Sequence, residues 1–326
     1  MSESTSSYVG AIRLTLKEEM SKDRSIIVIG EDVGAYGGIF RATLGLLDEF
    51  GPQRVVDTPI SEAGILGVGM GLALGGMRPV VEIMYMDFLQ LALEPLVTEV
   101  AMARFLSGGK LEVPLVVRTQ YNLGRTSGPQ HGQFFPSWFL QAPALSIALP
   151  STPADVVGLL HASMKAKKPV LFIESSALYN TTGPVPPGVS FELGDADIKR
   201  TGKDVTLIAI SRVVPEAMAA AEELAREGID VEVLDPRTVQ PLDTEAIVSS
   251  VKKTGRLLIA ADDQVLGGIG ASITSAVLDQ IFYSLQAPVK IIGSPPFPAP
   301  ANYDLEREYM VSKTGIAEGV KTLMAS

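Results

Sequence analysis

Thr58-Pro59-Ile60-Ser61-Glu62-Ala63 follows the strand-like run Arg54-Val55-Val56-Asp57 and precedes a segment rich in glycine. This stretch places the carboxylate of Glu62 at a turn from a strand to a helix. A helix start has free N–H groups that tolerate an acid, so Glu62 could simply cap the helix. Burial, in contrast, disfavours the charged form of a carboxylate, so a buried Glu62 would need a chemical role. Position alone leaves both interpretations open.

Six glycines lie between Gly64 and Gly76, interleaved with aliphatic residues. Each glycine costs a helix interior about 1 kcal/mol relative to alanine, so this helix needs close packing to be stable. We expect Gly64 to Gly76 to be buried against another helix or subunit, with Glu62 at the start of this helix. A dinucleotide-binding fingerprint is the alternative. It is disfavoured because Leu72 occupies its third glycine position and the glycines lie inside the helix.

The composition excludes several classes of function. The chain has 326 residues, of which 46% are hydrophobic, which is enough for two domains. Its net charge of −10 argues against nucleic acid or a membrane surface as a partner. It has no cysteine and only two histidines, His131 and His161, without a zinc-binding pattern, so we expect no metal site. Without a signal sequence or membrane-spanning run, we expect a cytoplasmic protein.

Short apolar strands alternate with helical stretches along most of the chain. This alternation predicts an α/β fold with two doubly wound domains, each a parallel sheet with helices on both faces. Asn180–Gly188 contains three prolines and two glycines and is typical of a linker. We therefore predict one domain over residues 1–185 and a second over residues 190–326. His161 lies in a helical stretch of the first domain and is expected to be structural.

Several motifs occur in an order that resembles one known family, the beta subunits of thiamine-diphosphate-dependent 2-oxo acid dehydrogenases. These enzymes are the decarboxylase components of pyruvate, branched-chain 2-oxo acid and acetoin dehydrogenase complexes. The resemblance runs from Tyr8 to the end and implies a thiamine-pyrimidine-binding domain followed by a transketolase C-terminal-like domain. Its motifs are Gly30-Glu31-Asp32-Val33-Gly34, Asp57-Thr58-Pro59-Ile60-Ser61-Glu62, Arg78-Pro79-Val80-Val81-Glu82, Gly128-Pro129-Gln130-His131-Gly132-Gln133 and Val233-Leu234-Asp235-Pro236-Arg237-Thr238.

The resemblance assigns roles to four residues. Glu62 would bond a ring nitrogen of the thiamine pyrimidine and so help to activate the cofactor. Phe88 matches the aromatic residue that packs on that ring, and Ile60 an apolar residue beside the cofactor. From the sequence alone, Phe88 is more typical of a core. His131, in a glycine-rich loop, suits proton transfer near neutral pH and would assist acyl transfer to a lipoyl group; a plain surface histidine is the alternative.

The resemblance also implies partners. The family's Gly-Asp-Gly and asparagine motif for magnesium and diphosphate is absent here, so an alpha subunit would hold both. A second copy of this chain would complete the heteromer. The basic subunit-binding domain of a lipoyl acyltransferase would dock on the more acidic second domain. Acids recur near its end at Asp304, Glu306, Glu308 and Glu318.

Departures from the family pattern bear on these expectations. Pro136 replaces an acid near His131 and puts the polar setting of that histidine in question. The family's structural potassium site maps to Leu115, Ser163, Met164, Ala166 and Lys168, where Ala166 and Lys168 replace an acid and an amide, so we predict no bound potassium. A transketolase-like enzyme with the whole site is disfavoured by the missing magnesium motif. A non-catalytic scaffold subunit is disfavoured by Glu62 and His131.

Overall fold

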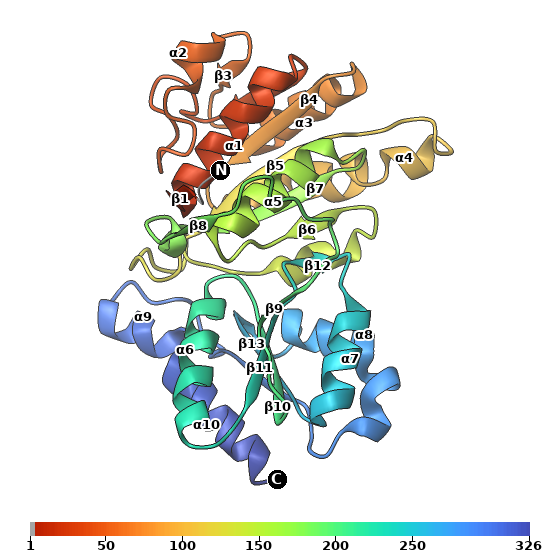
Figure 1. Cartoon of the computed structure of the whole chain (residues 1–326). Helices are drawn as coiled ribbons and strands as arrows, with labels where there is room; N and C mark the ends of the chain where they lie inside the picture. Colours follow the sequence, from red (N-terminus) through yellow and green to blue (C-terminus); the bar gives the residue numbers. More distant parts are fainter. Residues whose placement is uncertain (1–3) are drawn as a thin grey trace. The chain divides into compact units, whose positions relative to one another are not determined.

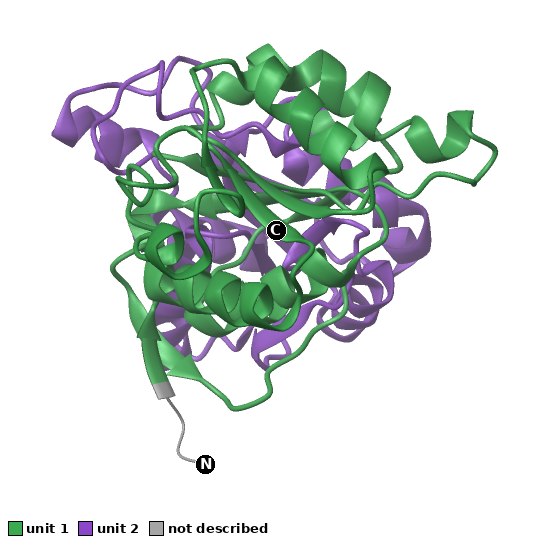
Figure 2. Ribbon diagram, turned by 90° about the horizontal axis from the view of Figure 1, so that it is seen from above, with its two compact units in different colours: residues 1–122, 139–193 green, residues 123–138, 194–326 purple. Residues whose placement is uncertain are grey.

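The computed structural model describes residues 4–326, which fall into two compact units (Figure 2). Unit 1 comprises the chain up to residue 122 together with residues 139–193, and unit 2 comprises residues 123–138 and 194–326. The segment 123–138, which carries His131, thus belongs to the second unit although it lies within the range expected for the first domain. The boundary proposed between residues 185 and 190 stays a prediction.

Unit 1 is built on parallel strands in the order β6-β7-β5-β4-β2-β3 (Figure 1). The strands are β2 (Ile26–Gly30), β3 (Val55–Asp57), β4 (Arg78–Ile83), β5 (Val116–Tyr121), β6 (Ser146–Ala148) and β7 (Val170–Ser175). The α-helices are α1 (Tyr8–Lys22), α2 (Leu46–Phe50), α3 (Glu62–Leu74), α4 (Ala103–Leu106) and α5 (Pro153–Lys165). Shorter helical turns are η1 (Phe88–Ala92), η2 (Pro95–Val100), η3 (Pro136–Gln141) and η4 (Ser176–Leu178).

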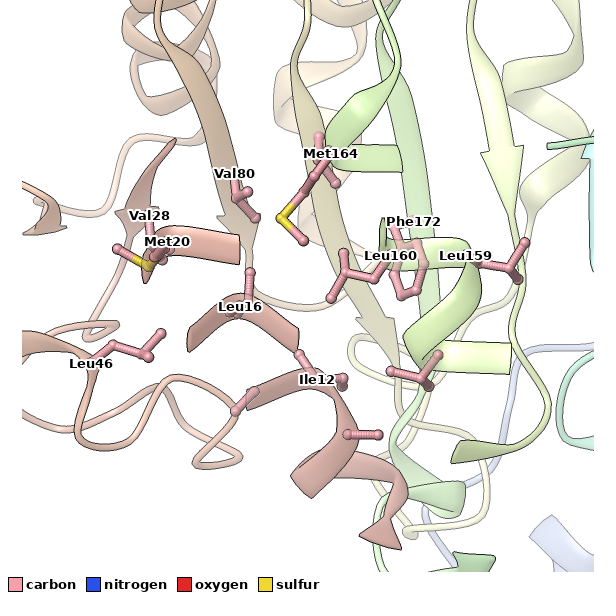
Figure 3. Packing of buried hydrophobic residues seen from close by; sticks show 14 of the residues in the cluster. Ile12, Leu16, Met20, Val28, Leu46, Val80, Leu159, Leu160, Met164 and Phe172 are labelled. Carbon is pink, nitrogen blue, oxygen red and sulfur yellow. The ribbon is translucent and has the colours of Figure 1, made fainter. Parts of the chain in front are cut away.

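Helices cover both faces of this sheet because successive strand residues point to opposite sides. Val80 joins a buried cluster with Leu16 of α1 and Leu160 of α5 (Figure 3). Its neighbour Val81 faces α3, where a Cβ atom on Gly69 would lie 2.6 Å from the Val81 side chain. Gly69 therefore allows α3 to pack closely on β4, and this layered arrangement confirms the predicted α/β fold.

The segment expected to be a linker is partly a strand. Residues Thr182–Val185 form β8, which pairs in antiparallel register with β1 (Ser4–Ser7). Pro184 is compatible with this two-stranded ribbon, since proline is tolerated in edge strands. The stretch expected to be a linker thus contains a paired strand over residues 182–185.

Unit 2 has a second sheet in the order β14-β13-β10-β11-β9, in which β9 is antiparallel to β11 and the other pairs are parallel. Helices α6 and α10 lie on one face, and α7 and α8 on the other (Figure 1). The residues of unit 2 form the strands β9 (Asp197–Arg200), β10 (Val205–Ala209), β11 (Val231–Asp235), β12 (Thr238–Gln240), β13 (Leu257–Gln264) and β14 (Lys290–Ser294). Of these, β12 is not part of the five-stranded sheet. Its helices are α6 (Val213–Arg226), α7 (Thr244–Thr254), α8 (Ile269–Ile281), η5 (Phe282–Ser284), α9 (Tyr303–Tyr309) and α10 (Lys313–Met324).

The carbonyl groups at the end of α5 already have a cationic partner. Arg78 donates from Nε to the carbonyl of Met164 at 2.8 Å and from Nη2 to the carbonyl of Ala166 at 3.1 Å. The carbonyl of Leu115 accepts from Val170 N at 2.9 Å. Three of the carbonyl groups at the expected potassium positions are thus satisfied by donors of the chain itself, which gives the potassium prediction a structural reason.

We expect the melting temperature of the protein to be the same in potassium and in sodium buffers. Arg78→Gln should lower the free energy of unfolding by about 1–3 kcal/mol, because buried carbonyl groups lose a charged donor. Thermal unfolding in each buffer measures the melting temperature, and denaturant unfolding measures the free energy of unfolding. A melting temperature several degrees higher in potassium than in sodium would contradict the proposal that the Arg78 guanidinium group takes the place of the potassium ion.

Candidate active site

Glu62 is the first residue of α3 and only 6% exposed. Ser61, the residue that precedes the helix, makes no side-chain cap. Within residues 4–326, the Glu62 carboxylate has no hydrogen-bond partner. The positive end of the helix dipole favours an acid at this position, but it supplies no specific partner. Glu62 is therefore a buried carboxylate whose hydrogen-bonding capacity is free for a bound group.

A second buried acid, Glu31, lies near Glu62. It follows the last residue of β2, and β2 and β3 are adjacent and parallel, so the segments after them begin at the same edge of the sheet. Burial raises the pKa of Glu31, and the negative charge of Glu62 raises it further. Glu31 was missed as a site residue, although its place directly after a strand in Gly30-Glu31-Asp32 was a usable signal.

Phe88 begins η1 and is half-buried. Its ring makes an edge-to-face contact with Tyr85, at 5.6 Å between centroids and 87° between planes. Part of the ring remains accessible, which fits a stacking surface better than a fully buried core residue. Ile60, between β3 and α3, is 81% exposed. An aliphatic side chain so exposed is available to a ligand or to another chain.

His131 lies in unit 2, whereas Glu62, Ile60 and Phe88 lie in unit 1. The loop that carries His131 is held by the buried carboxylate of Glu306, which accepts from Gly124 N at 2.9 Å and from Thr126 N at 2.8 Å. Gly128 adopts φ +71 and lies against Ala301, where a Cβ atom would be 3.2 Å from the alanine side chain. His131 itself is half-buried. The loop is thus positioned by the region around α9.

His161, the other histidine, lies between α5 and α1. Its side chain is 13% exposed and its Nδ1 atom is 3.1 Å from a carboxylate oxygen of Glu19. Burial lowers the pKa of His161, although the nearby Glu19 and Glu18 oppose that shift. This environment agrees with the expected structural role.

Within residues 4–326, no group of three or more histidine, aspartate or glutamate residues is placed to hold a metal ion. No helix in this range is long and apolar enough to cross a membrane. A cavity of about 830 Å³ in unit 1 is lined by Arg104, Glu112, Lys165 and Phe191 among others, and contains none of the four candidate residues.

Asp263 connects the His131 loop to the sheet of unit 2. It is 5% exposed and accepts hydrogen bonds from Ile269 N at 3.0 Å and Gln264 N at 2.8 Å. Ser137, in the loop segment, also donates to it. Burial outweighs these hydrogen bonds and raises the pKa of Asp263 to about 6.

The raised pKa predicts a stability that depends on pH. Because the folded state binds this proton more tightly than the unfolded state, Asp263 lowers the stability as pH rises from about 4 to about 6. Asp263→Asn should therefore gain about 2 kcal/mol relative to wild type between pH 4 and pH 7. Denaturant unfolding across this range measures the difference, with Asp279→Asn, an exposed acid on α8, as control. Parallel pH profiles for Asp263→Asn and wild type would contradict it.

Comparisons with known proteins identify both parts of the chain. Residues 4–182 match the family described as "Transketolase, pyrimidine binding domain", and residues 194–316 match "Transketolase, C-terminal domain". The chain is 39% identical to the 2-oxoisovalerate dehydrogenase subunit beta of Bacillus subtilis, over 98% of this chain and 99% of that one. It is 41% identical to the acetoin:2,6-dichlorophenolindophenol oxidoreductase subunit beta of Bacillus subtilis, over 92% of each.

Two further comparisons agree. The chain is 38% identical to the pyruvate dehydrogenase E1 component subunit beta of Rhizobium meliloti, over 96% of this chain and 68% of that one. Among solved structures, one described as "Split gene transketolase, inactive beta4 tetramer" aligns over 97% of both chains with a TM-score of 0.77 and 20% identity. At that identity the structural match shows the fold alone.

Proposed function

The chain belongs to the family of beta subunits of thiamine-diphosphate-dependent 2-oxo acid dehydrogenases, and on that premise we propose that it binds the pyrimidine half of the cofactor through Glu62. The observation that carries this proposal is the buried carboxylate of Glu62, which has no hydrogen-bond partner within residues 4–326. The side chain is nearly buried, yet its carboxylate oxygens are not among the enclosed polar atoms, so a ligand can reach them and complete their hydrogen bonds. The ring nitrogens of an aminopyrimidine are partners of the required kind.

Thiamine diphosphate would supply a carbanionic carbon for chemistry at the carbonyl group of the substrate. In this proposal Glu62 holds a proton at its carboxyl group for a pyrimidine nitrogen, and Phe88 provides a ring surface for stacking. Ile60 adds apolar contact. Burial and, after it, the negative charge of Glu62 raise the pKa of Glu31, so Glu31 holds a proton more tightly than an ordinary glutamate does. His131 moves a proton during acyl transfer to a lipoyl group.

We infer that an alpha subunit supplies the magnesium and diphosphate site, because this sequence lacks the motif for both. A second copy of this chain completes the assembly. Gly69 is the buried glycine of α3, whereas Gly67 and Gly71 are exposed, and a Cβ atom at either would meet nothing within 4 Å. Val68 beside them is 53% exposed. This apolar face of α3 is lined by glycines and exposed. It supports close packing of a partner chain, and such packing would bury the glycines as expected from the sequence.

The substrate stays undecided among pyruvate, branched-chain 2-oxo acids and acetoin, because relatives with all three activities are 38–41% identical to this chain. The proposed location is the cytoplasm. An acetoin dehydrogenase subunit is the second candidate, favoured by the 41% identity to the acetoin relative. Turnover of each compound by the chain copurified with its alpha subunit would identify the substrate.

Glu62→Gln should lower the turnover of the reconstituted complex by about 10²–10⁴-fold, the usual contribution of a positioned acid–base group. The assay is 2-oxo acid decarboxylation, with circular dichroism to show that the fold persists. Glu245→Gln, in the first turn of α7, is the control for an acid that only supports a helix start. Near wild-type turnover of Glu62→Gln would return Glu62 to a capping role.

His131→Ala should reduce acyl transfer to lipoyl groups more than it reduces decarboxylation. The reason is that a loop histidine carries a proton for the transfer step, whereas Glu62 acts on the cofactor. Decarboxylation measured with an artificial electron acceptor can be compared with the activity of the full complex. Equal losses in both assays would refute this division of roles.

We further propose that the acyltransferase docks on exposed acids of unit 2. Glu306 must be removed from the expected set because it is 2% exposed and holds the His131 loop. Asp304, Glu308 and Glu318 are exposed and stay in it. Truncation is unsuitable as a test because Ile316, Val320 and Leu323 of α10 are in the core.

Asp304→Lys with Glu308→Lys should slow association with the basic subunit-binding domain and weaken its dependence on salt, because opposite charges steer the encounter. Screening already limits their reach to roughly 8 Å at about 0.15 M salt. Surface plasmon resonance over a salt series measures the association rate, with Asp279→Lys on α8 as control. An association rate that is independent of salt, or equal for the double variant and the control, would exclude this docking surface.

A further inference from the structure

Tyr85 has a backbone conformation that is unfavourable for its residue type. Its φ angle is +62, in the left-handed region where aromatic residues are uncommon. Such a conformation is strained and persists only where the surroundings impose it. Tyr85 lies between β4 and Phe88, so the turn that it forms determines how the chain enters η1.

One residue, Gln120, binds the backbone of this turn. Gln120, on β5 and fully buried, accepts a hydrogen bond at Oε1 from Tyr85 N at 3.2 Å. The backbone carbonyl of the same residue accepts from Met86 N at 2.7 Å. Gln120 therefore binds two successive N–H groups of the turn, next to the buried end of β4.

The orientation of the Gln120 amide follows from its other neighbour. Its Nε2 atom donates to Glu82 Oε1 at 3.1 Å, and the second oxygen of Glu82 accepts from Arg118 Nη1 at 2.6 Å. An arginine has only donors, and an ionised carboxylate has only acceptors. Glu82 thus requires the amide NH₂ group on its side, which leaves the amide oxygen for Tyr85 N.

The turn in turn places Phe88. Phe88 N donates to the carbonyl of Tyr85 at 3.0 Å, and the two rings meet edge to face. A second edge-to-face contact, at 5.8 Å between centroids, fixes the Tyr85 ring against Phe40. We propose that Gln120 is a positioning residue that places Phe88 for the cofactor through the Tyr85 turn. This inference rests on the proposed function, in which Phe88 packs on the thiamine pyrimidine.

Two substitutions test the proposal in the complex of this chain with its alpha subunit. Gln120→Met keeps the size of the side chain but removes its donor and acceptor, and should raise the Kd for thiamine diphosphate at saturating magnesium by about tenfold or more, since tenfold corresponds to about 1.4 kcal/mol. Isothermal titration calorimetry measures the Kd. Thr206→Val is the control, because it removes buried hydrogen bonds to Ser250 and Thr254 in unit 2.

Gln120→Glu gives a reading that a general loss of stability would not produce. The introduced carboxyl group would face Glu82 and, beyond it, Arg118 and Glu174. When protonated, it can donate to Glu82 and accept from Tyr85 N as the amide does; when ionised, it repels Glu82. Its cofactor affinity should therefore approach that of wild type at low pH and fall as pH rises, relative to wild type at each pH. Because this variant restores the contacts at low pH, the test holds even where Gln120→Met does not fold.

The outcomes separate the two proposals. Wild-type complex that does not bind thiamine diphosphate overturns the proposed function. Wild-type binding together with an unchanged Kd in Gln120→Met, or a loss no larger than that of Thr206→Val, overturns the positioning role alone. A Gln120→Glu variant whose affinity relative to wild type is independent of pH also overturns it.

Discussion

The buried ion-pair network of Arg118 is the interaction on which unit 1 depends most. Its guanidinium group is fully buried and is bonded through Nε and Nη2 to the two oxygens of Glu174, at 2.7 and 3.0 Å, and through Nη1 to Glu82. Burial opposes the charge of Arg118, but Glu174 and Glu82 raise its pKa above the ordinary value. Breaking a buried pair of this kind by removing one partner typically costs about 3–5 kcal/mol. The network therefore holds the three adjacent strands β4, β5 and β7 in one register.

Five acids of unit 1 differ in their partners. Glu82 and Glu174 are bonded to Arg118, and Asp57 accepts a hydrogen bond from Gly34 N at 2.6 Å. Glu31 and Glu62 are buried without hydrogen-bond partners within residues 4–326. Acids bonded within the chain stabilise the fold, whereas nearly buried acids without such bonds point to a bound ligand. The contrast within one sheet is stronger support for a cofactor site than the burial of Glu62 alone.

In unit 2, an acid that was expected to be exposed for a partner is instead buried and hydrogen-bonded within the chain. Glu306, expected on an acidic docking surface, is instead a structural acid that holds the loop of His131. Asp262 is likewise engaged, since both of its oxygens bind Arg212, at 2.5 and 2.6 Å. Asp263, beside it, carries the raised pKa. The acids near the end of the chain are therefore of two kinds. Some are exposed, and others are buried and hydrogen-bonded within the fold.

The sequence by itself determined the layered α/β fold, because alternating apolar strands and amphipathic helices have few other ways to bury their apolar faces. Its motifs also determined the family and pointed to Glu62, whose place at a strand-to-helix turn is a local property. The tertiary structure decided what depends on neighbours distant in the chain: that residues 123–138 belong to unit 2, that β8 pairs with β1, and that Glu306 is buried. It also showed that the charge of Glu62 acts on Glu31, and that the Tyr85 turn is bonded to Gln120. Burial and hydrogen bonding between separate strands are set by how the strands assemble, and no short sequence pattern encodes them.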